Sequence, residues 1–263
     1  MYTMGIDIGS TSSKAVIMED GSRIVASCVV AVGTGTSGPQ RVIEDAMQAA
    51  DLDKEDIEYI IATGYGRRSI AGANEQISEI TCHARGVHFL LPSTRTIIDI
   101  GGQDVKVIRV DENGSVMNFV MNEKCAAGTG RFLEVMARVL ECKVSELSML
   151  SRQAKQAVPI SSTCTVFAES EVISRLAGGN SREDVVAGIH DSVARRVASL
   201  GKRVGLIPDI VMTGGVALND GVVKAMMQEL KTEIKTSPLP QLTGAVGAAL
   251  LAYQKAGKAK TSA

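Results

Sequence analysis

The feature that most constrains this chain is an internal repeat. Residues 6–16 (IDIGSTSSKAV) align without a gap on residues 98–108 (IDIGGQDVKVI), 92 residues further along. Each copy reads as an apolar strand with Asp, then Ile-Gly, a four-residue turn and a Lys that opens a second strand. A shorter echo relates residues 60–66 (IIATGYG) to residues 210–216 (IVMTGGV). Because only two copies are visible, the repeat predicts a duplicated domain and not a solenoid.

Apolar periodicity and turn residues predict mixed sheets that are covered by helices. Strands are expected at residues 3–8, 14–18, 24–32, 58–62, 96–100, 105–110, 116–121, 210–213 and 233–236. Helices are expected at residues 42–50, 75–90, 131–140, 166–176, 182–206 and 220–230. We expect an α/β fold with an N-terminal lobe, residues 1–95, and a C-terminal lobe, residues 96–243. A C-terminal helix, 244–256, is expected to pack back on the first lobe, and residues 257–263 to form a frayed tail.

Composition excludes several classes of function. The chain has 28 basic and 29 acidic residues, 3% aromatic residues and no Trp. It therefore lacks the bulk positive charge and the aromatic platforms that typify nucleic-acid binding. Residues 1–7 have an early acid and no basic or long apolar stretch, so we expect no signal peptide there. The longest apolar stretch, near residues 245–252, falls short of the ~20 residues of a membrane span. We expect a cytoplasmic protein. Five Cys with no C-x-x-C pair indicate neither a disulfide framework nor a zinc site of usual spacing.

The turns after Asp7 and Asp99 are candidate phosphate loops. Gly9 lets a backbone N–H approach an oxyanion, and Lys14 supplies a point charge. Further donors come from Ser10, Thr11 and Ser12. We expect Asp7 and Asp99 to face each other across a cleft and to hold Mg²⁺, largely through water and phosphate. The alternative is a pair of ordinary hairpins with Gly turns; the duplicated Asp disfavours it, because burying an unpaired carboxylate is costly.

Two further Gly-rich segments follow predicted strands. Residues 213–216 (TGGV) lie where an open α/β sheet receives a nucleotide, and their glycines permit close backbone approach. Residues 33–38 (GTGTSG) fit the dinucleotide pattern G-x-G-x-x-G, with Asp53 near the expected offset. However, the preceding strand is the third of its unit, and Pro39 follows the last Gly. We therefore interpret residues 33–38 as a structural or partner-facing loop.

Cys125 and Cys164 each precede a predicted amphipathic helix. A helix N-terminus carries partial positive charge and free N–H groups, which suit an anionic metal–sulfur cluster. Two Cys cannot complete a cluster that usually takes four thiolates, whereas a two-fold homodimer supplies four. The residues alone leave open a 4Fe–4S cluster on a dimer axis or two buried Cys acting as small apolar residues. The other three, Cys28, Cys82 and Cys142, are expected in the core.

Five segments carry a resemblance to a known family: residues 63–67 (TGYGR), 99–106 (DIGGQDVK), 122–132 (NEKCAAGTGRF), 161–171 (SSTCTVFAESE) and 212–216 (MTGGV). From residue 4 to residue 245 the chain resembles the activator ATPases of (R)-2-hydroxyacyl-CoA dehydratases. These belong to the superfamily of acetate kinase, sugar kinases, heat-shock chaperones and actin. The resemblance implies a duplicated actin-like ATPase fold and a homodimer in which Cys125 and Cys164 of each copy bind one shared 4Fe–4S cluster.

The resemblance also implies an activity. Each copy would bind ATP and Mg²⁺ and drive one electron from reduced ferredoxin or flavodoxin to an iron–sulfur dehydratase, in an oxygen-sensitive system from an anaerobic bacterium. The residues expected to contact ATP are Gly9, Ser10, Thr11, Ser12, Ser13, Lys14, Thr63, Gly64, Asp99, Gly101, Gly102, Gln103, Asp104, Thr213, Gly214, Gly215, Val216 and Gln241. We expect Gln103 to position the attacking water with help from Asp104, and Asp7 and Lys14 to complete the catalytic set.

Other functions fit the same fold. A small-molecule kinase, such as a type III pantothenate kinase, also begins with Asp-x-Gly but has no use for Cys125 and Cys164. A filament-forming relative of actin would polymerise without iron. Within the resembled family, the chain could instead be the reductase of a double-cubane cluster protein or an ATPase subunit of a benzoyl-CoA reductase.

Overall fold

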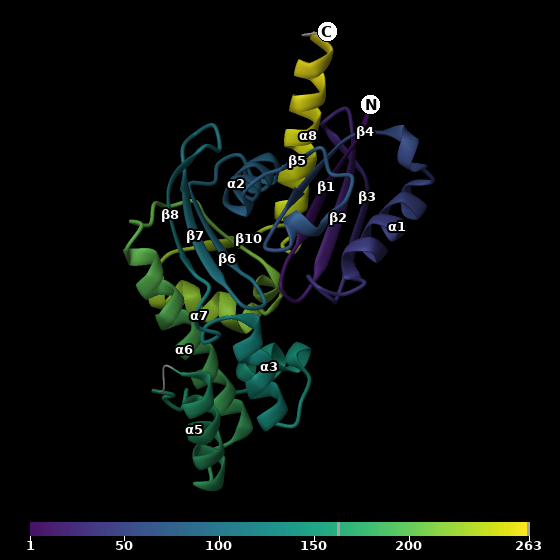
Figure 1. The fold of residues 1–263 in the computed structure, drawn as a ribbon. Helices are drawn as coiled ribbons and strands as arrows, with labels where there is room; N and C mark the ends of the chain where they lie inside the picture. The colour runs from purple at the N-terminus through teal and green to yellow at the C-terminus, as the bar shows by residue number, and fades with distance from the viewer. Residues whose placement is uncertain (162–163, 262–263) are drawn as a thin grey trace. The chain divides into compact units, whose positions relative to one another are not determined.

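The computed structural model describes residues 1–161 and 164–261 and contains two five-stranded mixed sheets with flanking helices (Figure 1). The chain divides into two compact units. Unit 1 comprises Met1–Arg95, Val110–Met117 and the segment from Ser237 onward, and unit 2 comprises Thr96–Arg109 and Asn118–Thr236. The predicted fold class, with mixed sheets flanked by helices in two halves, is confirmed.

The sheet of unit 1 has the order β3-β2-β1-β4-β5. Its strands are β1 (Tyr2–Ile8), β2 (Ser13–Glu19), β3 (Arg23–Val30), β4 (Ile57–Thr63) and β5 (Glu75–Gln76). The first three strands are antiparallel neighbours, whereas β4 runs parallel to β1 and β5 runs parallel to β4. The three helices of this unit are α1 (Gly38–Ala50), α2 (Glu79–Leu90) and α8 (Thr243–Thr261).

Helices cover both faces of this sheet. Ala15 and Ile17 of β2 belong to the same apolar cluster as the buried residues of α1, whereas Val16 and Met18 pack with the start of α8. Since neighbouring strand residues point to opposite faces, α1 and α8 lie on opposite sides of the sheet, as Figure 1 also shows. This double burial explains why β1 and β2 read as nearly continuous apolar runs.

The sheet of unit 2 has the order β10-β9-β6-β7-β8. Its strands are β6 (Thr96–Ile100), β7 (Val105–Val110), β8 (Val116–Asn122), β9 (Ile210–Thr213) and β10 (Ile234–Thr236). The helices of this unit are α3 (Gly130–Val139), α4 (Leu147–Arg152), α5 (Thr165–Ala177), α6 (Arg182–Lys202) and α7 (Asp220–Leu230). In both units the central strand has an antiparallel hairpin partner on one side and a parallel strand on the other. This shared connectivity is the structural form of the repeat.

Several boundaries differ from the sequence expectations. The helix expected from residue 75 begins at Glu79, because residues 75–76 pair with β4. The long helix α6 ends at Lys202 and not at residue 206, since Gly205 adopts a φ of +77°. Short α4 was not predicted. The last helix, α8, continues through Thr261, so residues 257–261 of the expected frayed tail are helical, and residues 262 and 263 lie outside the described residues. Among the described helices, none has the length and apolar character needed to cross a membrane.

Candidate functional site

The first Asp-x-Gly turn forms a compact polar group in unit 1. Asp7 on β1 pairs with Lys14 on β2 and with Thr63 on the other side. Lys14 Nζ lies 3.3 Å from Asp7 Oδ2, and both side chains are largely buried. Gly64 follows Thr63 with a φ of +84°, and a Cβ there would collide with the Asp7 carboxylate. Position 64 therefore requires glycine, because the backbone there passes directly against the Asp7 carboxylate.

The loop that follows Asp7 is braced by the segment that fits the dinucleotide pattern. Gly9 N donates to Ser12 O at 3.0 Å, and Thr34 N donates to Gly9 O at 3.0 Å. A Cβ at Gly33 would collide with the Gly9 and Ser10 carbonyls. Residues 33–38 thus have a structural role, as their position after the third strand predicted. The Ser13 side chain is buried, and its hydroxyl donates to Val32 O at 2.8 Å.

Unit 2 repeats this arrangement with a stronger ion-pair network. Asp99 on β6 pairs with Lys106 on β7 and with Thr213 on β9. Lys106 Nζ lies 3.3 Å from Asp99 Oδ2 and 2.7 Å from Asp104 Oδ2. Gly214 has a φ of +85°, and a Cβ there would collide with Ile100 O and meet Asp99 Oδ1 at 2.9 Å. Each unit therefore holds an Asp between a Lys and a Thr-Gly pair.

Lys106 is a site residue that the sequence reasoning did not assign. Its side chain is 3% exposed and binds both carboxylates of the second loop. The repeat could have identified it, because Lys106 aligns with Lys14, which the sequence predicted as a phosphate-binding residue. Buried lysine between two acids indicates a preformed charge arrangement and not a surface ion pair.

The second loop is tied to the start of α3. Gly130 N donates to Gly101 O at 2.9 Å, and Arg131 N donates to Gly102 O at 2.8 Å. Gln103 at the loop tip is exposed. The remaining predicted contacts lie elsewhere: Gly215 and Val216 in the 3₁₀ turn Gly215–Leu218, and Gln241 in the turn before α8. Asp7 belongs to unit 1 and Asp99 to unit 2, so their meeting across a cleft stays a prediction.

Within residues 1–161 and 164–261, no group of three or more His, Cys, Asp or Glu side chains is placed to hold a metal ion. Mg²⁺ is commonly bound by one or two carboxylates together with water and substrate phosphates. Each unit, taken by itself, has a buried carboxylate beside a glycine turn.

The two candidate cluster ligands differ in their local structure. Cys164 is exposed and is the N-cap residue of α5, where free N–H groups begin the helix. Cys125 is partly buried and lies in the turn before α3, whose N-cap residue is Thr129. The expectation that both Cys stand directly before a helix is therefore met only by Cys164. Arg196 of α6 approaches Cys125, with Nη2 3.2 Å from Sγ.

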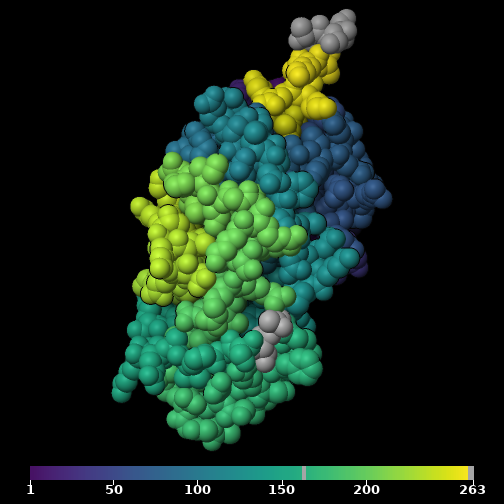
Figure 2. All heavy atoms as spheres, turned by 90° about the vertical axis from the view of Figure 1, so that its left-hand side faces the viewer, coloured from purple at the N-terminus to yellow at the C-terminus, as the bar shows by residue number. Residues whose placement is uncertain are grey.

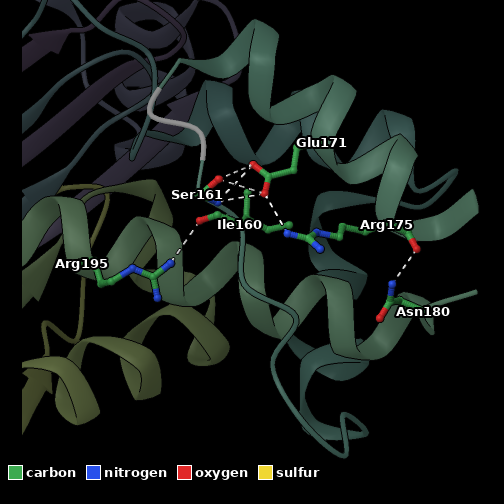
Figure 3. A network of polar contacts seen from close by, with 6 residues as sticks. All are labelled: Ile160, Ser161, Glu171, Arg175, Asn180 and Arg195. Atoms are coloured by element: carbon green, nitrogen blue, oxygen red, sulfur yellow. Dashed lines mark hydrogen bonds and ion pairs between the residues drawn. The ribbon is translucent and has the colours of Figure 1, made fainter. Parts of the chain in front are cut away.

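The segment before Cys164 is held by α5 and α6 (Figure 3). Ser161 N donates to Glu171 Oε2 at 3.0 Å, and Glu171 also pairs with Arg175 at 3.3 Å. Arg195 Nη2 donates to Ile160 O at 3.2 Å. Residues 162 and 163 of the predicted motif lie outside the described residues.

The other three cysteines lie in or against the apolar clusters. Cys82 is fully buried, and burial raises the pKa of its thiol to about 12. Cys28 and Cys142 are partly buried against the apolar clusters of their units, and burial raises the pKa of each thiol. All three thiols therefore stay protonated near neutral pH, unlike a metal ligand. The predicted core position is confirmed for Cys82, whereas Cys28 and Cys142 are only partly buried against the core.

Comparison with known proteins places this geometry in a family. The activator of lactoyl-CoA dehydratase from Anaerotignum propionicum is 60% identical over 98% of this chain and 100% of its own length. The (R)-2-hydroxyglutaryl-CoA dehydratase activating ATPase of Acidaminococcus fermentans is 60% identical over 98% of this chain and 99% of its own. One solved structure is the activator of the 2-hydroxyisocaproyl-CoA dehydratase from Clostridium difficile with bound ADPNP. It superposes with a TM-score of 0.97 at 57% identity, over 100% of this chain and 98% of its own.

A more distant structure supports the fold alone. The ROK family glucokinase of Streptomyces griseus superposes with a TM-score of 0.60 at 15% identity, over 97% of this chain and 100% of its own. The predicted actin-like ATPase and sugar kinase fold is thereby confirmed. Residues 4–252 match one family model over nearly the whole chain. The chain belongs to the BadF/BadG/BcrA/BcrD ATPase family.

Proposed function

We propose that this protein is an ATP-dependent reductive activator of an iron–sulfur (R)-2-hydroxyacyl-CoA dehydratase. In this role it passes one low-potential electron from reduced ferredoxin or flavodoxin to the dehydratase, coupled to ATP hydrolysis. Two relatives at 60% identity are named as an activator of lactoyl-CoA dehydratase and as the activating ATPase of (R)-2-hydroxyglutaryl-CoA dehydratase. The observation that carries the proposal is the combination, in one chain, of two Asp–Lys–glycine turns with two cysteines, Cys164 exposed at the start of α5 and Cys125 beside Arg196 of α6.

We assign Cys125 and Cys164 as the ligands of one 4Fe–4S cluster shared by two copies. When bound, the cluster supplies a one-electron carrier. Two thiolates per chain require a second copy to complete the four that such a cluster usually takes. Val166, Phe167 and Ile173 of α5 are 67%, 69% and 52% exposed and follow Cys164 closely. Figure 2 shows the teal-to-green surface of this part of unit 2 facing the viewer. A second copy would cover the exposed side chains of Val166, Phe167 and Ile173 on α5.

The nucleotide is assigned to the paired turns. Asp7 and Asp99 would hold Mg²⁺ through water, Lys14 would bind phosphate, and Gln103 would orient the attacking water with help from Asp104. Lys106 keeps Asp99 and Asp104 in place. Gly130 and Arg131, at the start of α3, donate hydrogen bonds to the second loop. A movement of this loop when ATP binds or is hydrolysed would therefore be passed to the turn that carries Cys125.

Iron analysis tests the assignment directly. Anaerobically prepared wild type should contain about four Fe and four sulfide per dimer, with an EPR signal after reduction. Cys125→Ala and Cys164→Ala should each lose the iron, whereas Cys142→Ala, which removes a partly buried thiol outside the proposed ligand set, should keep it. A colourless, iron-free protein that phosphorylates a small alcohol would contradict the proposal and favour the kinase alternative.

ATP turnover tests the nucleotide residues separately. Asp7→Asn and Gln103→Ala should slow ATP hydrolysis at least tenfold while the absorption of the cluster stays intact, because neither side chain is a proposed ligand of the cluster. Unchanged hydrolysis would remove these residues from the catalytic set. Electron transfer to a purified dehydratase, a double-cubane protein or a benzoyl-CoA reductase then separates the partners within the family.

A further inference from the structure

Arg196 has a fixed and specific contact with Cys125. Its Nη2 lies 3.2 Å from the Cys125 sulfur, a normal distance for a hydrogen bond to sulfur. Its aliphatic stem passes Gly128, where a Cβ would meet Arg196 Cδ at 3.1 Å, and Gly128 has a φ of +89°. The turn after Cys125 therefore uses a glycine where the arginine side chain crosses it. This side chain is half-buried and lines a cavity of about 730 Å³ beneath the turn.

The helix that carries Arg196 holds both cysteine segments. Arg195, its neighbour, donates to Ile160 O in the segment that leads to Cys164 (Figure 3). The opposite face of α6 is anchored in the core of unit 2 through Val193, Ala194 and Val197, each 1% exposed. Consecutive arginines on one rigid helix thus tie down the two loops that bear the candidate ligands.

We propose that Arg196 is a positioning residue for the cluster and sets its reduction potential through Cys125. This inference rests on the proposed function. Reduction adds one electron from an external donor, breaks no bond, and makes the cluster one unit more negative. A guanidinium N–H directed at a ligand sulfur stabilises that extra charge, because hydrogen bonds to the sulfurs and nearby positive charge favour the reduced state. We therefore expect the cluster to be easier to reduce with Arg196 in place than with its four thiolate ligands alone.

A redox titration of the full-length protein tests this role. Wild type, Arg196→Gln, Arg196→Lys and Arg203→Gln are prepared anaerobically, assayed for iron, and titrated with dithionite while EPR follows the reduced cluster. We expect Arg196→Gln to shift the reduction equilibrium at least tenfold toward the oxidised state, which is 59 mV for one electron. Arg196→Lys, which keeps the charge but loses the planar donor, should shift less. Arg203 lines the same cavity without a bond to sulfur, so Arg203→Gln should match wild type.

The outcomes separate this inference from the proposed function. Wild type without iron overturns both. Iron-loaded Arg196→Gln with the wild-type potential overturns the role of Arg196 and leaves the proposed function standing. An equal shift in Arg203→Gln also overturns it, because the effect would then be general charge and not a contact. If Arg196→Gln does not fold, Arg196→Lys decides, and a wild-type potential in that variant contradicts the inference.

Discussion

At the scale of single residues, the two halves of the repeat use the same ion pair with different burial. Lys14 retains 14% side-chain exposure and pairs with one carboxylate, whereas Lys106 is 3% exposed and pairs with Asp99 and Asp104. Removing one partner of a buried pair leaves an uncompensated charge, which costs far more than the pair itself contributes. Lys106 is therefore both a structural and a site residue.

Lys106→Met should lower the free energy of unfolding by about 3–5 kcal/mol, because it strips a buried carboxylate of its cation. Urea denaturation followed by circular dichroism measures this. The matched control is Lys235→Met, which removes an exposed lysine 3.5 Å from Asp209 and should cost about 0–1 kcal/mol. Similar losses in both variants would show that burial of the Lys106 network has no energetic consequence.

Burial of His190 makes the stability of the folded chain depend on pH. It is 1% exposed on α6, its Nε2 lies 3.3 Å from Asn219 Nδ2, and burial lowers its pKa from 6.5 to about 4. Because the folded pKa is the lower one, the unfolded chain takes up the proton first as pH falls. The contribution to stability is therefore full above about pH 6.5 and is lost as pH falls toward 4, by about 3 kcal/mol at most.

His190→Gln should flatten this part of the pH profile. Wild type should lose stability between pH 7 and pH 4.5 in urea titrations, and the variant should lose about 2–3 kcal/mol less over the same interval. His88→Gln serves as a comparison, since His88 is less buried than His190. A variant with the wild-type slope would assign the acid sensitivity to carboxylates elsewhere.

At the scale of elements, α2 and α8 pack backbone to backbone. A Cβ at Gly86 would collide with Thr243 O, and a Cβ at Gly247 would collide with Cys82 O. Both contacts involve helix backbone, which cannot move aside as a flexible side chain can. These glycines therefore set the spacing between the two helices, and His83 on α2 bonds Thr243 Oγ1 at 2.9 Å across it.

Gly247→Ala should destabilise unit 1 by about 1–3 kcal/mol or more, because the added methyl group overpacks the contact. Gly257→Ala lies ten residues further along the same helix, where a Cβ meets nothing within 4 Å. There alanine should stabilise by up to about 1 kcal/mol through helix propensity. Thermal unfolding of both variants checks the opposite signs, and a stabilised Gly247→Ala would contradict the close packing of α2 and α8.

Much of this element structure was predictable, because its signals are local. The Asp20-Gly21 turn, with φ values of +49° and +61°, joins β2 and β3 where turn residues interrupt the apolar pattern. What could not be predicted arises from long-range pairing. The placement of Thr63-Gly64 against Asp7 depends on the parallel register of β1 and β4, which no local pattern encodes. Likewise, Ser13 counts as a donor in the sequence, yet its hydroxyl is committed to Val32 O.

At the scale of the whole molecule, the proposed shared cluster requires a second copy, and α5 offers the surface for it. Phe167 is 69% exposed and lies three residues after Cys164. An exposed Phe beside two further exposed apolar side chains is costly in a monomer and is typical of an interface. Contacts at such a patch act mainly on association and leave the fold of each copy unchanged.

Phe167→Gln should weaken the dimer at least tenfold, because it replaces a large apolar side chain at the proposed interface with a polar one. Sedimentation equilibrium under anaerobic conditions measures the dissociation constant, and circular dichroism shows whether each copy stays folded. Phe89→Gln changes an equally large exposed side chain on α2 of unit 1 and should leave the dimer intact. Since four thiolates need two copies, Phe167→Gln should also lose iron on dilution, in parallel with the dimer. Iron retained by a monomeric Phe167→Gln protein would rule out a cluster shared between copies.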